Sequence, residues 1–122
     1  MKKILIVEDH ADIRRLVRMT LEFEDYEIHE ASNGAVGLQM AKDLQPDLVL
    51  LDVMMPGELD GLAACRLMKA QPQLAHMQVV MLTARGQSQD REAGLLAGAD
   101  EYLIKPFSPL QLIEKLNLRL AA

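Results

Sequence analysis

The sequence lacks the features that tie a chain to a membrane, to nucleic acid or to a disulfide framework. It holds a single cysteine, Cys65, which excludes an intramolecular disulfide and is typical of a reducing cytoplasm. No apolar run approaches the length that spans a bilayer, and only four apolar residues separate Lys3 from Glu8, so no secretory signal is predicted. Lysine and arginine total 13 against 18 aspartates and glutamates, and the net charge of −5 argues against direct binding of nucleic acid.

What the chain does contain is a series of short apolar runs. Its 122 residues, half of them hydrophobic, are enough for one domain with a real core. Four runs are continuous, which is typical of strands covered on both faces: residues 4–7, 48–51, 79–82 and 102–104. Residues 26–31 alternate between apolar and polar instead, which predicts a strand nearer the sheet edge. No repeat or linker is recognisable, so residues 1–122 are predicted to form one domain.

Amphipathic segments lie between these runs. The apolar face of the first comprises Ile13, Leu16, Val17, Thr20 and Leu21 at helical spacing. Three residues of that helix point away from this face: Arg14, Arg15 and Arg18. Cys65 follows Leu62 by three residues in another such segment, so it is predicted to be a buried structural thiol.

Capping residues set the bounds of the other helices. The second covers residues 33–44, and Asp60 is a predicted N-cap of the third. The fourth covers residues 87–97, and Ser108-Pro109 is a strong start for the fifth. Strands and helices thus alternate five times, which predicts an α/β fold with a parallel sheet wrapped on both faces.

Charged and hydroxyl side chains follow four of the predicted strands. Glu8 and Asp9 follow the first, Asp52 the third, Thr83 the fourth and Lys105 the fifth. The carboxyl ends of parallel strands form one edge of a sheet, where the functional crevice of such folds lies. Each residue alone also has an ordinary structural explanation, such as a helix cap or a turn, but together they predict a site.

The chemistry of this set points to phosphoryl transfer. Three close carboxylates repel unless a cation neutralises them, and Mg²⁺ suits carboxylate ligands while leaving room for a phosphate oxygen. With Lys105 also pointing inward, Asp52 is placed to attack phosphorus and form an aspartyl phosphate, while Thr83 can donate a hydrogen bond to a phosphoryl oxygen. His10 beside the acids could be an additional metal ligand, although a solvated loop histidine is the simpler interpretation.

Four motifs in order resemble the receiver domain of two-component response regulators: "ILIVEDH", "LLDVMMPG", "VVMLTA" and "YLIKPF". The resemblance covers the whole chain. It implies a flavodoxin-like (βα)5 three-layer sandwich, with a five-stranded parallel sheet in the order 2-1-3-4-5 and a receiver domain over residues 1–122.

The resemblance also implies a role for each site residue. Mg²⁺ would be held by Glu8, Asp9, Asp52 and the backbone carbonyl of Met54. Asp52 would be the phosphoacceptor, and Lys105, before a cis peptide bond to Pro106, would contact the phosphoryl group. The switch residues would be Thr83 and Tyr102.

Partners and output follow from the same resemblance. The phosphoryl donor would be a sensor histidine kinase or a phosphotransfer protein, for which the arginines of the first helix are either a docking face or a solvated one. The output would be a downstream protein, a fused domain or a phosphorylation-dependent homodimer, in the cytoplasm and without direct contact to nucleic acid or membrane. The domain would accept phosphate on its own aspartate and could dephosphorylate itself, with no turnover of an external substrate.

Three other functions fit the sequence less well. A haloacid-dehalogenase-like phosphohydrolase would need a second aspartate where Met54 stands. A nucleotide-binding module would need a glycine-rich turn where the chain has "VEDHAD". A phosphorylation-dead scaffold would lack an acid, the hydroxyl or the lysine. The chain departs from the family in "MPGELDG", which is one residue longer than usual and predicts altered partner contacts, and Met54 and Arg85 are variable positions that influence phosphoryl lifetime.

Overall fold

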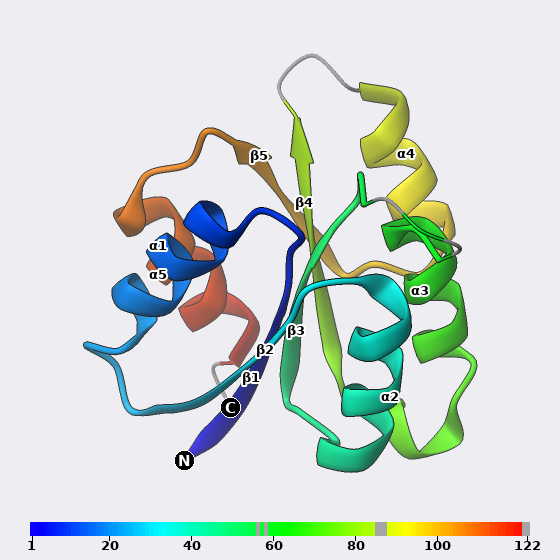
Figure 1. Ribbon diagram of the computed structural model, residues 1–122, viewed down its shortest axis with the longest axis horizontal. Coiled ribbons are helices and arrows are strands. Elements are labelled where there is room, and N and C mark those ends of the chain that lie inside the picture. The colour runs from blue at the N-terminus through cyan, green and yellow to red at the C-terminus, as the bar shows by residue number, and fades with distance from the viewer. Residues whose placement is uncertain (56, 58, 85–87, 121–122) are drawn as a thin grey trace.

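The computed structural model describes residues 1–55, 57, 59–84 and 88–120, without the side chains of residues 84 and 88–91. In this part of the chain five strands and five helices alternate (Figure 1). The strands are β1 (Lys2–Val7), β2 (Tyr26–Ala31), β3 (Leu48–Asp52), β4 (Gln78–Ala84) and β5 (Glu101–Lys105). The helices are α1 (Ala11–Leu21), α2 (Gly34–Leu44), α3 (Gly61–Lys69), α4 (Ser88–Leu96) and α5 (Pro109–Leu120), with a 3-10 turn, η1, at Pro72–Leu74.

The strands form one parallel sheet in the order β2-β1-β3-β4-β5, which confirms the predicted flavodoxin-like topology. The alternating strand, β2, is at an edge, as its pattern predicts. β3 is central, and all five of its residues are buried, including its last residue, Asp52. The order places the ends of β1 and β3 side by side, so Glu8 and Asp9, after β1, meet Asp52, at the end of β3, at one edge of the sheet.

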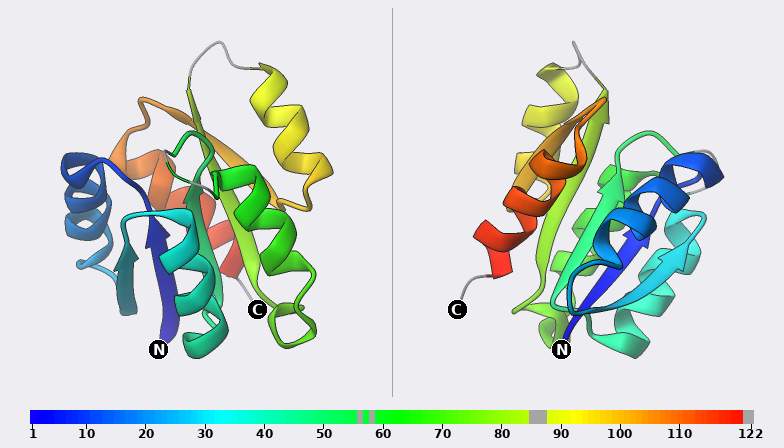
Figure 2. Two further views of the ribbon diagram at one scale, coloured as in Figure 1. Left: turned by 45° about the vertical axis from the view of Figure 1, so that its right-hand side comes forward. Right: turned by 90° about the vertical axis from the view of Figure 1, so that its left-hand side faces the viewer.

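Helices cover both faces of the sheet and make three layers (Figure 1, Figure 2). α1 and α5 lie on one face, where Val17, Leu21, Leu112 and Leu116 are buried against the sheet. α2, α3 and α4 lie on the other face. Cys65 of α3 is fully buried there, and burial raises the pKa of its thiol to about 11. The prediction of a buried structural thiol is confirmed.

The predicted caps are also confirmed. Asp60 Oδ1 accepts a hydrogen bond of 2.8 Å from the Ala63 amide at the start of α3. At α5 the Ser108 hydroxyl accepts from the Gln111 amide, and the Gln111 side chain accepts from the Ser108 amide, so the two residues form a capping box. Asn33 precedes α2 as its N-cap rather than belonging to the helix.

Two details of the helices differ from prediction. Leu16, expected on the buried face of α1, is half exposed, whereas the contact of that face with the core is made by Val17, Thr20 and Leu21. The turn η1 was not predicted, since three residues are too few to show a period. The predicted start of the fourth helix, Gln87, lies outside the residues that the structure describes.

Candidate functional site

Four of the side chains predicted to share one edge of the sheet lie together: Glu8, Asp9, Asp52 and Lys105. Glu8, directly after β1, is fully buried, and Asp52 at the end of β3 is 3% exposed. From the end of β5, Lys105 reaches past β4, and its Nζ lies 2.7 Å from Glu8 Oε1 and 3.2 Å from Asp52 Oδ1. The site is therefore two buried carboxylates bridged by one ammonium group.

The electrostatics of the site are set by one cation among several acids. Burial and the neighbouring Glu8 carboxylate raise the pKa of Asp52 to about 8, even though Lys105 opposes the rise. Burial by itself would lower the pKa of Lys105, but Glu8 and Asp52 outweigh this effect and raise it. The site thus holds more negative charge than Lys105 can neutralise.

Two carboxylate oxygens of the site carry part of the excess negative charge that Lys105 does not neutralise. Glu8 Oε2 and Asp9 Oδ1 are buried and have no hydrogen-bond partner among the described residues. One ligand atom from each of Glu8, Asp9, His10 and Asp52 lies within 4.8 Å of the others. Buried carboxylate oxygens without a donor suit a hard divalent cation, so the residues present fit the Mg²⁺ that the resemblance implies.

The residues around Asp52 hold it in a defined position. The Met54 amide donates to Asp52 Oδ1 at 3.4 Å, and the Met54 side chain is exposed. Gly61, at the start of α3, lies so close that any side chain there would overlap the backbone oxygen of Asp52. The Met54 carbonyl as a metal ligand remains a prediction.

The predicted switch residues lie on the two strands beyond Asp52. Thr83 is buried near the end of β4, opposite Ile104 of β5. Tyr102 is half-buried against the core in this structure, with Lys115 Nζ 5.7 Å from its ring centre, rather than turned to solvent. The bond between Lys105 and Pro106 is cis, as expected.

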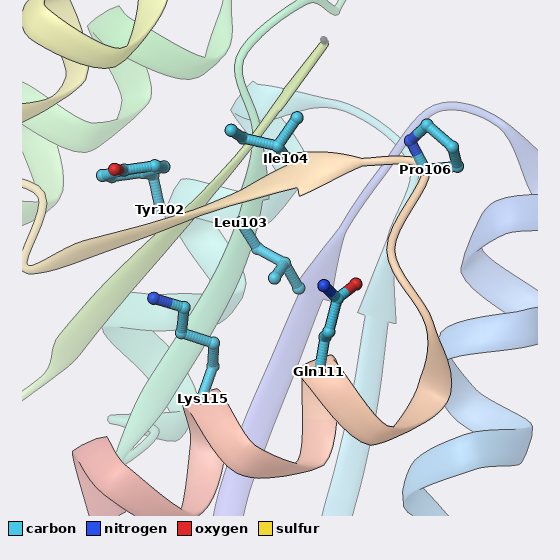
Figure 3. Close-up of a pocket in the computed structure, with 6 residues that line it drawn as sticks. All are labelled: Tyr102, Leu103, Ile104, Pro106, Gln111 and Lys115. Carbon is cyan, nitrogen blue, oxygen red and sulfur yellow. The ribbon is translucent and has the colours of Figure 1, made fainter.

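Tyr102 also borders a pocket of about 360 Å³ between β5 and α5 (Figure 3). Gln111 and Lys115 of α5 point from the helix toward the strand and form one wall of this pocket. The pocket places a hollow directly beside the predicted switch residue.

Two arginines of α1 were wrongly expected to point away from the sheet. Arg14 Nη1 donates to the Glu8 carbonyl at 2.8 Å, and Arg14 Nε pairs with Glu30 at 3.1 Å. Arg18 Nη1 pairs with the same carboxylate at 2.7 Å, whereas Arg15 is exposed. Arg14 therefore fixes the backbone at Glu8.

Sequence reasoning missed Glu30 as the partner of these arginines. A clue was present, because Glu30 continues the alternation of Tyr26 and Ile28 on the covered face of β2, where an acid needs a cation. Two other features named from the sequence, Arg85 and part of the "MPGELDG" loop at residues 56 and 58, lie outside the described residues.

Comparisons with known proteins show the family of the chain. The family model for the response regulator receiver domain matches residues 4–117. Transcriptional regulatory protein ResD from Bacillus subtilis is 46% identical over 114 residues, which cover 91% of this chain and 45% of ResD. The crystal structure of a putative response regulator from Chloroflexus aurantiacus matches with a TM-score of 0.94 at 33% identity, covering 99% of this chain and 98% of the other.

Another solved structure that matches is the receiver domain of a sensor histidine kinase from Pseudomonas aeruginosa, with a magnesium ion coordinated in its active-site cleft. Its TM-score is 0.91 at 30% identity, covering 99% of this chain and 98% of that one. The fold, the site and these matches show that the chain belongs to the response regulator receiver domain family of two-component signalling.

The chain spans about half the length of the curated relatives that it matches. Among the described residues, none of the helices is both long and apolar enough to cross a membrane. The cytoplasmic location predicted from the sequence remains a prediction.

Proposed function

We propose that this domain accepts a phosphoryl group on Asp52, in a Mg²⁺-dependent transfer from a phosphohistidine, and that this changes a partner-binding surface. The observation that supports the transfer most is a buried carboxylate held at a strand end between Glu8 and Lys105. Both hydrogen bonds described for Asp52 reach Oδ1, which leaves Oδ2 for attack on phosphorus. The new O–P bond forms as the P–N bond of the donor breaks, and the donor imidazole, which carries a proton on its other ring nitrogen, leaves as the neutral group.

The chain's own residues prepare this step. Lys105 holds Asp52 and would neutralise charge on the phosphoryl oxygens. Glu8, Asp9, Asp52 and the Met54 carbonyl would hold Mg²⁺, which would supply further neutralisation of that charge when bound. The magnesium ion in the Pseudomonas receiver supports this assignment.

No turnover of an external substrate is proposed. A hydrolase of this type would need a general acid two residues after the nucleophile, and Met54 cannot donate a proton. Asp52 would receive a phosphoryl group once and lose it by hydrolysis of its own acyl phosphate. The domain would then act as a switch that stays on for the lifetime of the acyl phosphate.

The direct test is labelling of the purified protein. With a small acyl phosphate or a phosphorylated kinase as donor, we expect label on Asp52 in Mg²⁺, and at least about 100-fold slower uptake in EDTA. Peptide mapping by mass spectrometry identifies the labelled residue. Label that maps elsewhere, or uptake indifferent to EDTA, would contradict the proposal.

The surface made by α4, β5 and α5 is the proposed output face. It carries exposed hydrophobic side chains, which on a soluble surface often mark a protein-binding site. They are Leu95, Leu96, Ile104, Leu110 and Leu118. Because ResD and similar relatives are transcriptional regulators of about twice this length, a fused output domain, a separate protein or a second copy of the chain are the proposed occupants.

Thr83 is proposed to pass the signal to that face. A phosphoryl group adds nearly two negative charges beside Thr83, whose hydroxyl would move to donate a hydrogen bond. Tyr102, half-buried beside the pocket in Figure 3, would then repack into the space beneath α4. The phosphoryl group would shift a population between two packings of the same fold.

Thr83→Ala is therefore expected to accept phosphate on Asp52 yet lose most of the response at the output face. Amide hydrogen exchange across residues 84–108, with and without a phosphoryl mimic, measures that response. Thr83→Ser, which keeps the hydroxyl, is the matched control and should respond like the wild type. Equal responses in Thr83→Ala and the wild type would show that the signal leaves Asp52 by another route.

A further inference from the structure

The imidazole of His10 lies against the two buried oxygens that lack a hydrogen-bond donor. His10 Nδ1 is 3.4 Å from Asp9 Oδ1 and 3.9 Å from Glu8 Oε2. These are the same two oxygens that are buried without a partner among the described residues. Glu8 itself is fully buried, so its Oε2 cannot turn to solvent for a partner.

Among the described residues, the ion pairs of the His10 ring are those with Asp9 and Glu8. His10 is the N-cap residue of α1, yet its side chain makes no capping hydrogen bond. The His10 side chain is 66% exposed, and its Nδ1 faces the acids. A nitrogen and two carboxylate oxygens therefore converge from three consecutive residues, with Asp52 completing the group.

The spacing of these atoms suits a common ion. In the tetrahedral arrangement that Zn²⁺ prefers, ligands bound at about 2.0–2.1 Å are roughly 3.3 Å apart. The four candidate atoms lie within 4.8 Å of one another, so the longest of their separations would shorten by about 1.5 Å to bring them to one ion. Side-chain rotation at the exposed ring can supply that movement.

We propose that His10 supplies a nitrogen ligand to the carboxylate site, so that the site takes up Zn²⁺ or a similar transition-metal cation in competition with Mg²⁺. The inference rests on the proposed cation site of Glu8, Asp9 and Asp52 and adds a determinant of its metal selectivity. Imidazole is a preferred ligand of Zn²⁺, whereas Mg²⁺ prefers oxygen and keeps its waters. His10 should thus strengthen Zn²⁺ binding and leave Mg²⁺ binding nearly unchanged.

The test is metal binding to the purified protein rather than phosphorylation. We expect His10→Asn to weaken Zn²⁺ binding about tenfold or more, measured by competition with a chromophoric chelator, because loss of even an indirect ligand contact costs that much. Mg²⁺ binding should change less than about twofold. His76→Asn is the matched control, since His76 is exposed and precedes β4 at the far end of the strands.

A residue-specific readout separates His10 from the other two histidines. In long-range ¹H–¹⁵N spectra of the imidazoles, one equivalent of Zn²⁺ should shift the ring nitrogens of His10, and Asp52→Asn should weaken that effect. His29, which lies 2.9 Å from Glu27, reports any adventitious binding there. The inference is wrong if His10→Asn binds Zn²⁺ as tightly as the wild type and if Zn²⁺ does not shift the His10 ring signals. In that case His10 only pairs with the acids.

Failure of the proposed function would look different. A wild-type protein that does not bind Mg²⁺ and takes up no phosphoryl group would overturn the proposed function. The Zn²⁺ titration of His10 would still decide the inference in that case, because it does not require Mg²⁺ or a phosphoryl donor.

Discussion

Replacing Asp52 by asparagine is expected to abolish phosphoryl uptake and, at the same time, to stabilise the metal-free fold. The first effect follows because an amide is not a nucleophile toward phosphorus, so labelling should fall below detection. The second follows because the buried carboxylates of Glu8 and Asp52 repel each other, and asparagine removes the charge of one of them. The 2.7 Å ion pair of Glu8 and Lys105 remains.

The raised pKa of Asp52 determines how the stability of the metal-free fold changes with pH. An aspartate has a pKa of about 3.9 in an unfolded chain, and burial and Glu8 raise the pKa of Asp52 to about 8 in the fold. The folded protein therefore binds an extra proton between these values, and the stability linked to that proton is full below about pH 4 and lost as pH rises through about 8. Without metal the wild type should lose stability over this window, and Asp52→Asn should lose less.

Denaturant titration at several pH values checks this. At pH 8 without metal we expect Asp52→Asn to exceed the wild type by about 1–3 kcal/mol in free energy of unfolding, and near pH 4 the two should converge. Added Mg²⁺ should stabilise the wild type more than the variant. Wild-type and variant curves that run parallel from pH 4 to 8 would contradict a crowded acid site.

Lys105→Met is expected to have the opposite effect on stability. It leaves the buried Glu8 and Asp52 carboxylates without their shared cation, and removal of one partner from a buried pair is strongly destabilising. Near pH 8 we expect a loss of about 2–4 kcal/mol. The loss should shrink at pH 5, where Asp52 is protonated in the fold, and phosphoryl uptake should slow as well because the transferred oxygens lose a counter-charge.

Lys69→Met is the matched control for this prediction. Lys69 is about as exposed as Lys105, 23% against 21%, and its Nζ also lies 2.7 Å from a carboxylate, that of Asp100. Lys69 lies away from the acid site, so Lys69→Met should destabilise the fold, and added Mg²⁺ should not restore the lost stability. In Lys105→Met, by contrast, saturating Mg²⁺ should recover a large part of the lost stability, since a cation returns to the acids. Equal responses of the two variants to Mg²⁺ would refute a special role for Lys105.

Local sequence predicted the sheet and its charged edge well. Continuous apolar runs mark β1, β3 and β4, and parallel strands must end at one edge, so the sequence alone places Asp52 and Lys105 together. That inference needs only the hydrophobic period of each segment, which identifies the strands, and the fact that parallel strands have their carboxyl ends at the same edge of the sheet.

Side-chain pairing across elements could not be predicted in the same way. Arg14 and Arg18 have the spacing of an outward face, yet α1 lies close enough to β2 for both to reach Glu30. The half-buried state of Tyr102 and the position of the His10 ring likewise depend on how α5 and the turn after β1 pack. Such contacts follow from helix placement over the sheet, which helical periodicity does not specify.

The link from Lys105 to Glu8 joins residues that are 97 positions apart. Contacts of such long sequence separation close late in folding, because the loop entropy must be overcome before they contribute. During synthesis Glu8, Asp9 and Asp52 leave the ribosome well before Lys105, so for that interval the nascent chain carries the acids without their cation. The proposed phosphoryl transfer should therefore begin only after β5 has joined the sheet, and a nascent chain that ends before Lys105 should take up no phosphoryl group.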